Sequence, residues 1–77
     1  MDKKKIHAFV KKHSEILNEF ILKYEHDIEI VDMIKTMKKQ LVLDSQYLMN
    51  LGKVSKDDEV KWTKFVNLLI QFEKELQ

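Results

Sequence analysis

Residues 51–59 read LGKVSKDDE, and this stretch predicts where the chain reverses direction. Gly52 is the only glycine and proline is absent, so no other residue of the chain is a strong helix breaker. A glycine after a helix commonly takes the left-handed conformation that ends it. Ser55 followed three residues later by Asp58 is typical of a helix N-cap with a reciprocal partner. We therefore expect one helix to end near Gly52 and another to begin after Ser55.

On both sides of this turn, apolar residues recur at spacings of three and four, which is the period of one helix face. We expect helices over residues 3–25, 28–51 and 56–76, in a single helical domain over residues 1–77. The predicted fold is all-α, either a three-helix up-down-up bundle or a helical hairpin, and we expect it to dimerise. The main apolar stripes are Ile6, Phe9, Val10, His13, Ile16, Leu17, Phe20, Ile21 and Tyr24; Ile30, Ile34, Met37, Leu41, Leu48 and Leu51; and Val66, Leu69, Phe72 and Leu76.

The boundary between the first two segments is weaker than the turn at Gly52. Residues 25–27 interrupt the apolar pattern, and Asp27 is suited to cap the second helix, yet none of the three breaks a helix. Most of the residues at intervals of seven from Ile6 to Leu48 are apolar, so one continuous helix would keep its apolar stripe on one side. The alternative is therefore one long helix over residues 3–51 with a short returning helix. Such a rod needs a partner chain to cover its stripe, so this alternative implies an obligate dimer.

Composition limits the classes of protein to which the chain can belong. The 77 residues allow one small domain, and 44% of them are apolar, which is too many for a disordered segment. There is no cysteine, so disulfides and thiolate zinc sites are excluded. No apolar run reaches the roughly 20 residues of a membrane-spanning helix, and no signal-peptide core follows the basic N-terminus. We expect a cytoplasmic protein without a membrane span.

The sequence carries no catalytic or cofactor signature, and we expect neither an enzyme nor a protein with a cofactor, metal or small-molecule substrate. His7, His13 and His26 lack the four-residue spacing of a helical zinc site. No glycine-rich phosphate loop or nucleophile elbow is present. Residues 43–49 (LDSQYLM) look somewhat like the serine-glutamine-x-leucine-aspartate motif of small helical-hairpin phosphatases of the sporulation phosphorelay. Met49 stands in place of that family's essential aspartate, so the resemblance implies no activity here.

Polar residues interrupt two of the apolar stripes. His13 lies between Phe9 and Ile16, which predicts a partly buried histidine with one hydrogen-bond partner, or a pH- or register-sensing group at a dimer seam. Asp44 lies between Leu41 and Leu48 on the second stripe. It predicts either a kink or a charged pair across an interface.

Some apolar residues lie outside the main stripes, which is typical of a helix covered on more than one side. Because no helix of a three-helix bundle is central, we expect this surface to contact a protein partner, a second copy of the chain, or both. We place the interface on the third helix and on the C-terminal half of the second. The expected partner or dimer interface residues are His13, Leu48, Met49, Trp62, Phe65, Leu68, Leu69, Ile70 and Phe72.

Charge adds a second expectation about partners. The formal net charge is +1, and all fourteen basic residues are lysine, so the bidentate contacts that arginine makes with guanine and phosphate are absent. Nucleic acid is therefore not the expected partner. An acidic cluster is the expected charged docking patch for a protein. It consists of Glu25, Asp27, Glu29 and Asp32.

These features favour a small non-enzymatic interaction or regulatory protein that binds a partner and occludes it. Antirepressors, anti-sigma factors, immunity proteins and phage inhibitors are often short helical chains of this kind, in bacteria or phages. The alternative is a small helix-turn-helix-like nucleic-acid-binding module formed around Gly52. Asp57, Asp58 and Glu59 oppose it, because they open the helix that has to approach phosphate.

Overall fold

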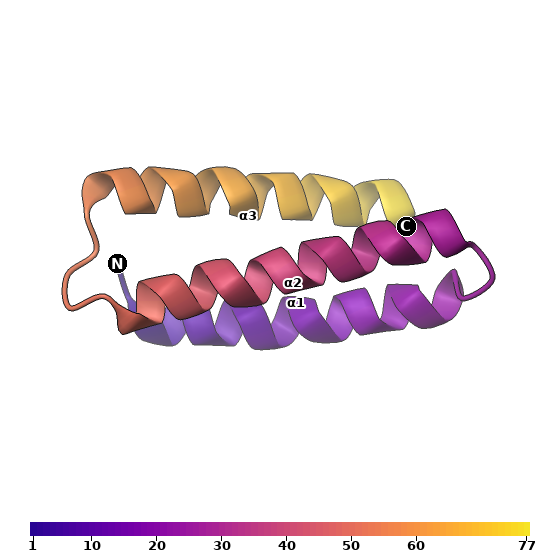
Figure 1. Ribbon diagram of the computed structural model, residues 1–77, viewed down its shortest axis with the longest axis horizontal. Coiled ribbons are helices and arrows are strands. Elements are labelled where there is room, and N and C mark those ends of the chain that lie inside the picture. The colour runs from indigo at the N-terminus through magenta and orange to yellow at the C-terminus, as the bar shows by residue number, and fades with distance from the viewer.

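In the computed structural model, which describes all 77 residues, the chain forms three helices and no strand. They are α1 (Lys3–Lys23), α2 (Ile28–Asn50) and α3 (Lys56–Leu76). Consecutive helices run in opposite directions within a body of 42 × 18 × 16 Å (Figure 1). The predicted all-α class and three-helix up-down-up order are confirmed. The alternative of one helix over residues 3–51 is wrong, because the chain turns between α1 and α2.

The N-terminal end of each helix is capped by a side chain, and the caps of α2 and α3 are the ones that the sequence indicates. These caps satisfy backbone N–H groups that have no partner within the helix. The Asp27 side chain accepts a hydrogen bond from the N–H of Ile30 at 3.2 Å and so caps the start of α2. The other caps are Asp2, which accepts from Lys4 at 2.9 Å, and Ser55, which accepts from Asp58 at 3.1 Å within a complete capping box.

The C-terminal end of α2 differs from the prediction. Gly52 does not have a positive φ, and Leu51 instead continues in an extended conformation with φ −75° and ψ 137°. The reason lies 48 residues away in the sequence. The ammonium group of Lys3 donates to the carbonyl oxygens of Leu51 at 2.6 Å and Met49 at 3.2 Å. Because a lysine of α1 satisfies these carbonyls, the left-handed glycine cap is not needed.

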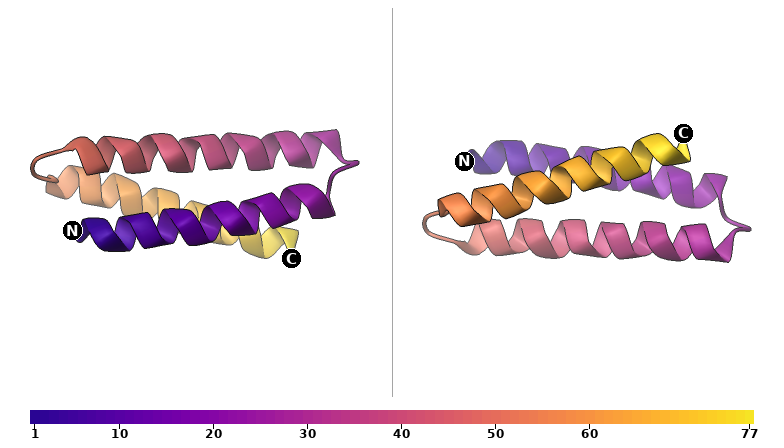
Figure 2. Two further views of the ribbon diagram at one scale, coloured as in Figure 1. Left: turned by 90° about the horizontal axis from the view of Figure 1, so that it is seen from below. Right: turned by 90° about the horizontal axis from the view of Figure 1, so that it is seen from above.

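The C-terminal end of α3 is likewise held by α1. The Tyr24 hydroxyl donates to the carbonyl oxygen of Leu76, and the Lys23 ammonium group donates to the same oxygen at 3.3 Å. Figure 2 shows that α3 crosses α2 obliquely, so that its C-terminus lies towards α1. These bonds therefore fix the C-terminal end of α3 to α1.

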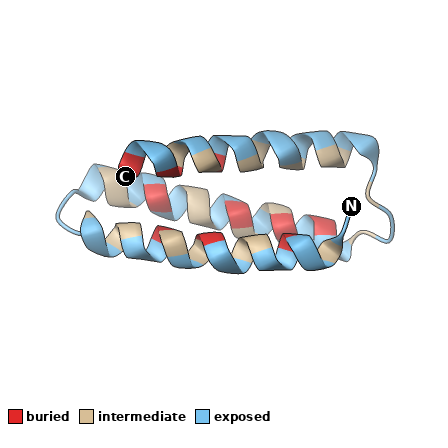
Figure 3. Ribbon diagram, turned by 180° about the vertical axis from the view of Figure 1, so that it is seen from behind, coloured by how far each residue is buried: buried red, intermediate tan, exposed pale blue.

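The core is formed by aliphatic side chains that lie between the helices. The buried positions lie on the inward sides of the three helices (Figure 3). The central cluster comprises Leu17, Ile34, Leu41, Leu69 and Leu76, with Ile6 and Leu48 buried beside it. None of the three helices combines the length and the apolar character needed to cross a lipid bilayer.

The three helices are not equally close. The α1 and α2 backbones approach each other along much of their length, whereas α3 comes near α2 at few places. Trp62, Phe65 and Phe72, which are large and half-buried, pack against the core from α3. Because aromatic side chains act as spacers, α3 stands further from its neighbours, and hollows remain along its contact with α2.

Candidate protein-binding groove

Two hollows lie between α2 and α3 and together form what we term the α2–α3 groove. The Trp hollow, of about 170 Å³, is lined by Asp44, Tyr47, Leu48, Asp58, Lys61 and Trp62. The Met hollow, of about 430 Å³, is lined by Asp32, Met33, Thr36, Met37, Leu68 and Phe72. On each helix the lining residues are related by spacings of three and four, so both hollows open on the same side of the bundle. The larger hollow is nearer the C-terminal end of α3.

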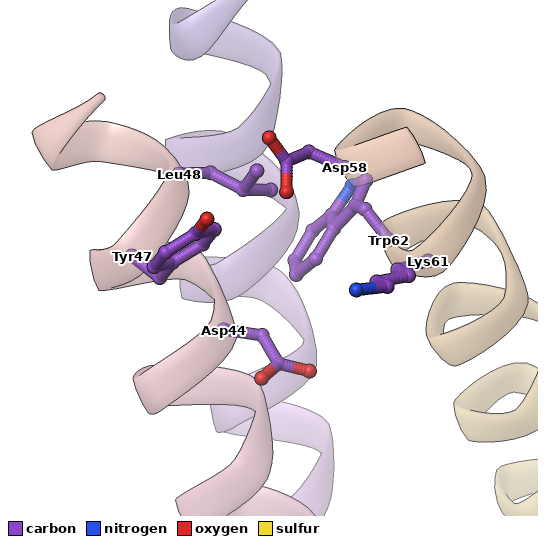
Figure 4. Close-up of a pocket in the computed structure, with 6 residues that line it drawn as sticks. All are labelled: Asp44, Tyr47, Leu48, Asp58, Lys61 and Trp62. Carbon is purple, nitrogen blue, oxygen red and sulfur yellow. The ribbon is translucent and has the colours of Figure 1, made fainter. Parts of the chain in front are cut away.

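The Trp hollow is bounded by two rings and two carboxylates. Figure 4 shows Asp44 and Tyr47 on α2 facing Asp58 and Trp62 on α3. The Asp44 carboxylate accepts a hydrogen bond from Gln40 at 2.6 Å. Asp44 therefore does not kink α2, which continues to Asn50. Both carboxylates reach the hollow from turns of regular helix.

The Trp62 ring is held in place by other rings behind it. Phe9 on α1 contacts it edge-on with ring centroids 5.8 Å apart, and Phe65 lies at 6.1 Å. Phe9 in turn stacks on His13 at 4.0 Å. Edge-on and stacked rings at these distances attract one another beyond their buried area. The indole is therefore a rigid wall of the groove.

The Asp58 carboxyl has a lowered pKa. The main cause is the hydrogen bond from the Ser55 hydroxyl, at 2.8 Å, which stabilises the ionised form. The Ser55 backbone N–H, the Tyr47 hydroxyl and the Lys61 ammonium group act in the same direction, against a smaller opposing effect of desolvation. This side of the Trp hollow therefore keeps its negative charge in mildly acidic solution.

The Met hollow is almost entirely apolar. Met33 is 55% exposed and Leu68 is 60% exposed, one on each bank, while Met37 and Phe72 form the half-buried floor. Asp32 is the only charged residue in its lining. Exposed methionines are flexible and polarisable, and they suit binding surfaces that adapt to a partner.

Charge is separated between the two sides of α2. The lining of the α2–α3 groove contains Asp32, Asp44 and Asp58 and one lysine, Lys61. A shallow hollow on the other side of α2, towards α1, is lined by three lysines and no carboxylate. These are Lys35, Lys38 and Lys39. The near-neutral total of +1 therefore conceals an acidic groove and a basic opposite side.

The expected interface residues are divided among three places. Leu48, Trp62, Leu68 and Phe72 line the α2–α3 groove. Met49 lines a separate hollow between α1 and α2. His13 and Leu69 are buried, and Phe65 and Ile70 are half-buried. Whether any of them contacts a partner stays a prediction. Of the four that line the groove, Leu68 is exposed, Trp62 and Phe72 are half-buried and Leu48 is buried.

His13 has the single hydrogen-bond partner that its position in the stripe predicts. Its Nδ1 lies 2.9 and 2.8 Å from the two carboxylate oxygens of Glu73 on α3. A carboxylate only accepts, so Nδ1 is the donor. Both residues are buried, with 9% of His13 and 6% of Glu73 exposed. The sequence analysis missed Glu73, although it interrupts the α3 stripe between Leu69 and Leu76 as His13 interrupts that of α1.

The residues of the expected acidic docking patch lie at the turn between α1 and α2 and in the first two turns of α2, and their role as a docking patch stays a prediction. Glu25, Asp27 and Glu29 lie at the turn between α1 and α2, where Asp27 is used as a cap and Glu25 lies 3.3 Å from His26. Asp32 belongs to the Met hollow. The aspartates that line the α2–α3 groove are Asp32, Asp44 and Asp58. The four-residue spacing from Asp32 through Thr36 and Gln40 to Asp44 is the sequence pattern that could have placed the first two on one face of the helix.

No group of three or more His, Asp or Glu side chains lies close enough together to hold a metal ion. Comparisons with protein-family models, curated proteins and solved structures find no significant match for this chain. The function therefore has to be inferred from the groove itself.

Proposed function

We propose that this chain is a small non-enzymatic interaction protein that binds a protein partner in the α2–α3 groove and occludes the bound surface. The observation that carries the proposal is the exposure of Met33 and Leu68 on opposite banks of one apolar hollow of about 430 Å³. Placing such side chains in water loses the free energy that their burial provides, about 25 cal/mol per Å² of apolar surface. A partner that fills the hollow recovers it.

The chemistry of the groove supports binding over catalysis. Its polar groups are three carboxylates, one lysine, the indole N–H of Trp62 and the hydroxyls of Tyr47 and Thr36, and no histidine or serine lies among them. Asp58 is held in its ionised form, which suits recognition of positive charge and not proton donation. The proposed role is therefore steric and electrostatic, in the cytoplasmic setting that the sequence favours.

The test compares two exposed leucines. Leu68 in the groove is 60% exposed and Leu22 on α1 is 70% exposed, so neither Leu68→Ser nor Leu22→Ser removes a core side chain. Immobilised wild type, Leu68→Ser and Leu22→Ser are each used to capture proteins from the native host, and bound proteins are measured by quantitative mass spectrometry. We expect a protein retained by wild type and Leu22→Ser and depleted about tenfold by Leu68→Ser, since burying a leucine contributes about 1.5–3 kcal/mol. Equal retention by all three would show that the groove is not the binding surface.

A second copy of the chain is the other protein that could cover this surface. Sedimentation velocity of wild type and Leu68→Ser at micromolar concentration separates the two. A wild-type dimer that Leu68→Ser dissociates places the second copy in the groove, whereas a monomer leaves the groove for a different protein.

Nucleic acid remains the alternative of a different class. A helix-turn-helix joins its helices at about 90–120°, whereas α2 and α3 run antiparallel (Figure 1). The first turn of α3 is also acidic, with Asp57, Asp58 and Glu59. Titration with duplex DNA at low salt tests this alternative, and we expect no saturable binding.

A further inference from the structure

We infer that the α2–α3 groove accepts a cationic amphipathic helix of another protein, with apolar side chains in the Met hollow and a lysine or arginine in the Trp hollow. This inference rests on the proposed function, because it names the kind of partner that the same groove binds. Three features of the groove support it: its length, its charge, and the different chemistry of its two ends.

The groove has the dimensions of a helix-binding site. On α2 the lining residues of the two hollows extend from Asp32 to Leu48, which corresponds to about 24 Å at 1.5 Å per residue. That is the length of about four helical turns. Both banks are helices whose lining side chains recur every three or four residues, so a third helix can insert its own ridge between them.

The charge of the groove selects a cationic partner. Asp32 is at the Met hollow, and Asp44 and Asp58 are at the Trp hollow, against the single cation Lys61. Like charges placed opposite one another disfavour a wrong partner, and opposite charges favour the right one. Basic residues flanking the apolar stripe of the incoming helix therefore meet carboxylates along the groove.

The Trp hollow is suited to the end of one basic side chain. It combines two carboxylates with the rings of Trp62 and Tyr47 (Figure 4). An ammonium or guanidinium group is attracted by carboxylates and by aromatic faces, most strongly by tryptophan. The Met hollow, with Met33, Leu68 and Phe72, takes the apolar anchors. An apolar cluster two to three turns from a basic residue is thus the pattern that fits.

A second copy of the chain fits this groove poorly. A two-fold dimer through the groove places Asp32, Asp44 and Asp58 of each copy near those of the other. The basic side of a second copy, at Lys35 and Lys38, has the right charge but lies on a different face. Repeated contacts between two different faces do not close into a dimer and lead to chains of molecules.

The test uses two synthetic helical peptides of 18 residues without tryptophan. One has leucine at positions i, i+3, i+4 and i+7 and lysine elsewhere, and the other has glutamate in place of each lysine. Trp62 is the only tryptophan of the protein and lines the groove, so its fluorescence reports binding directly. We expect a saturable change with the lysine peptide, weakened by salt, and at least tenfold weaker binding of the glutamate peptide.

Charge variants locate the binding. Asp32→Asn with Asp44→Asn removes two negative charges from the groove, and we expect binding of the lysine peptide to weaken about threefold or more. The matched control, Glu15→Gln with Glu19→Gln, removes two negative charges from the exposed face of α1 and should leave the affinity unchanged. Circular dichroism of both variants establishes that the helices are intact.

The possible failures are distinguishable. If both peptides bind equally, or if the Asp32→Asn, Asp44→Asn variant binds like wild type, the inference of a cationic partner is wrong. If only the glutamate peptide binds, and Leu68→Ser weakens that binding, the groove is still a protein-binding site and only the charge of the partner was misassigned. If neither peptide changes the fluorescence of Trp62, the inference of a cationic helix is refuted. If, in addition, Leu68→Ser captures the same proteins as wild type, the proposed function is refuted as well.

Discussion

The His13–Glu73 pair offers the sharpest test of how the bundle is held together. The two residues are 9% and 6% exposed, and they join α1 to α3 through two contacts of 2.9 and 2.8 Å. We consider three variants, Glu73→Ala, Glu73→Gln, and the double replacement His13→Leu with Glu73→Leu. They respectively remove the acceptor, keep a neutral acceptor, and remove both polar groups.

The expected magnitudes follow from what each variant leaves buried. Leaving a buried hydrogen-bonding group unpaired costs about 1–3 kcal/mol, and leaving a buried charge unpaired costs about 3–5 kcal/mol. We therefore expect Glu73→Ala to lower the free energy of unfolding by about 3 kcal/mol. A chain of 77 residues has a total of about 4–12 kcal/mol at the usual 0.05–0.15 kcal/mol per residue. Glu73→Ala thus removes a quarter of the stability or more.

The other two variants separate pairing from burial. The amide oxygen of Glu73→Gln still accepts from Nδ1 of His13, so we expect a smaller loss of about 1–2 kcal/mol. Replacing a buried polar pair by apolar side chains of similar volume is often neutral or stabilising. We expect the double leucine variant to be more stable than Glu73→Ala, although it also loses the stacking of His13 on Phe9 at 4.0 Å.

Urea denaturation followed by circular dichroism and by Trp62 fluorescence measures all of these variants. Coincident transitions by the two probes justify a two-state free energy. The interpretation is refuted if Glu73→Ala costs less than about 1 kcal/mol, or if Glu73→Gln is as unstable as Glu73→Ala. The first result would mean that water already satisfies His13 and that the pair does not fix α3 against α1. The second would mean that a neutral acceptor cannot replace the carboxylate of Glu73.

Three further predictions concern the helix ends. The pKa of the Asp58 carboxyl is lowered from 3.8, chiefly by the Ser55 hydroxyl. The ionised carboxyl therefore contributes to stability above pH 3.8, and this contribution is lost as the pH falls through the lowered pKa. Ser55→Ala should move the pKa of Asp58, measured by NMR, back towards 3.8. Gly52→Ala should leave the protein equally stable or raise the free energy of unfolding by about 0.4–1 kcal/mol. The reason is that a Cβ at this position has no neighbour within 4 Å and that the φ of Gly52 is not positive. A clear fall in the thermal midpoint would contradict this backbone conformation. Lys3→Met should cost about 1 kcal/mol and speed amide hydrogen exchange in the last turn of α2, whereas Lys4→Met, a change at an exposed neighbour on the same helix, should do neither.

The parts of the fold that the sequence predicted well are governed by local chemistry. A cap such as Asp27 or the Ser55–Asp58 box needs only residues within three positions of each other, so it is readable from the chain itself. The helix bounds accordingly differ from the expected ones by two residues or fewer. The conformation of Gly52 was predicted wrongly because it depends on Lys3, a residue that only the folded chain brings near.

The candidate site was predictable only in part, for a related reason. Leu68 and Trp62 were expected at an interface because of their positions on α3, and both line the groove. The opposite bank at Met33 and Tyr47 was missed, because periodicity assigns residues to a face and does not say how far apart two helices stand. That separation is set by which aromatic side chains point inwards, and this is a property of the packed structure.

The groove is thus a consequence of how α3 is attached. Phe9, Trp62 and Phe65 hold the N-terminal half of α3 at a distance from the other helices, while Tyr24 fixes its C-terminus to α1. A helix held by α1 at one end and spaced by rings at the other cannot close onto α2, so Leu68 stays 60% exposed at the Met hollow. Smaller residues in place of these rings would let α3 approach α2 and fill the hollows. The rings that stabilise the bundle therefore also keep open the surface on which a partner can bind.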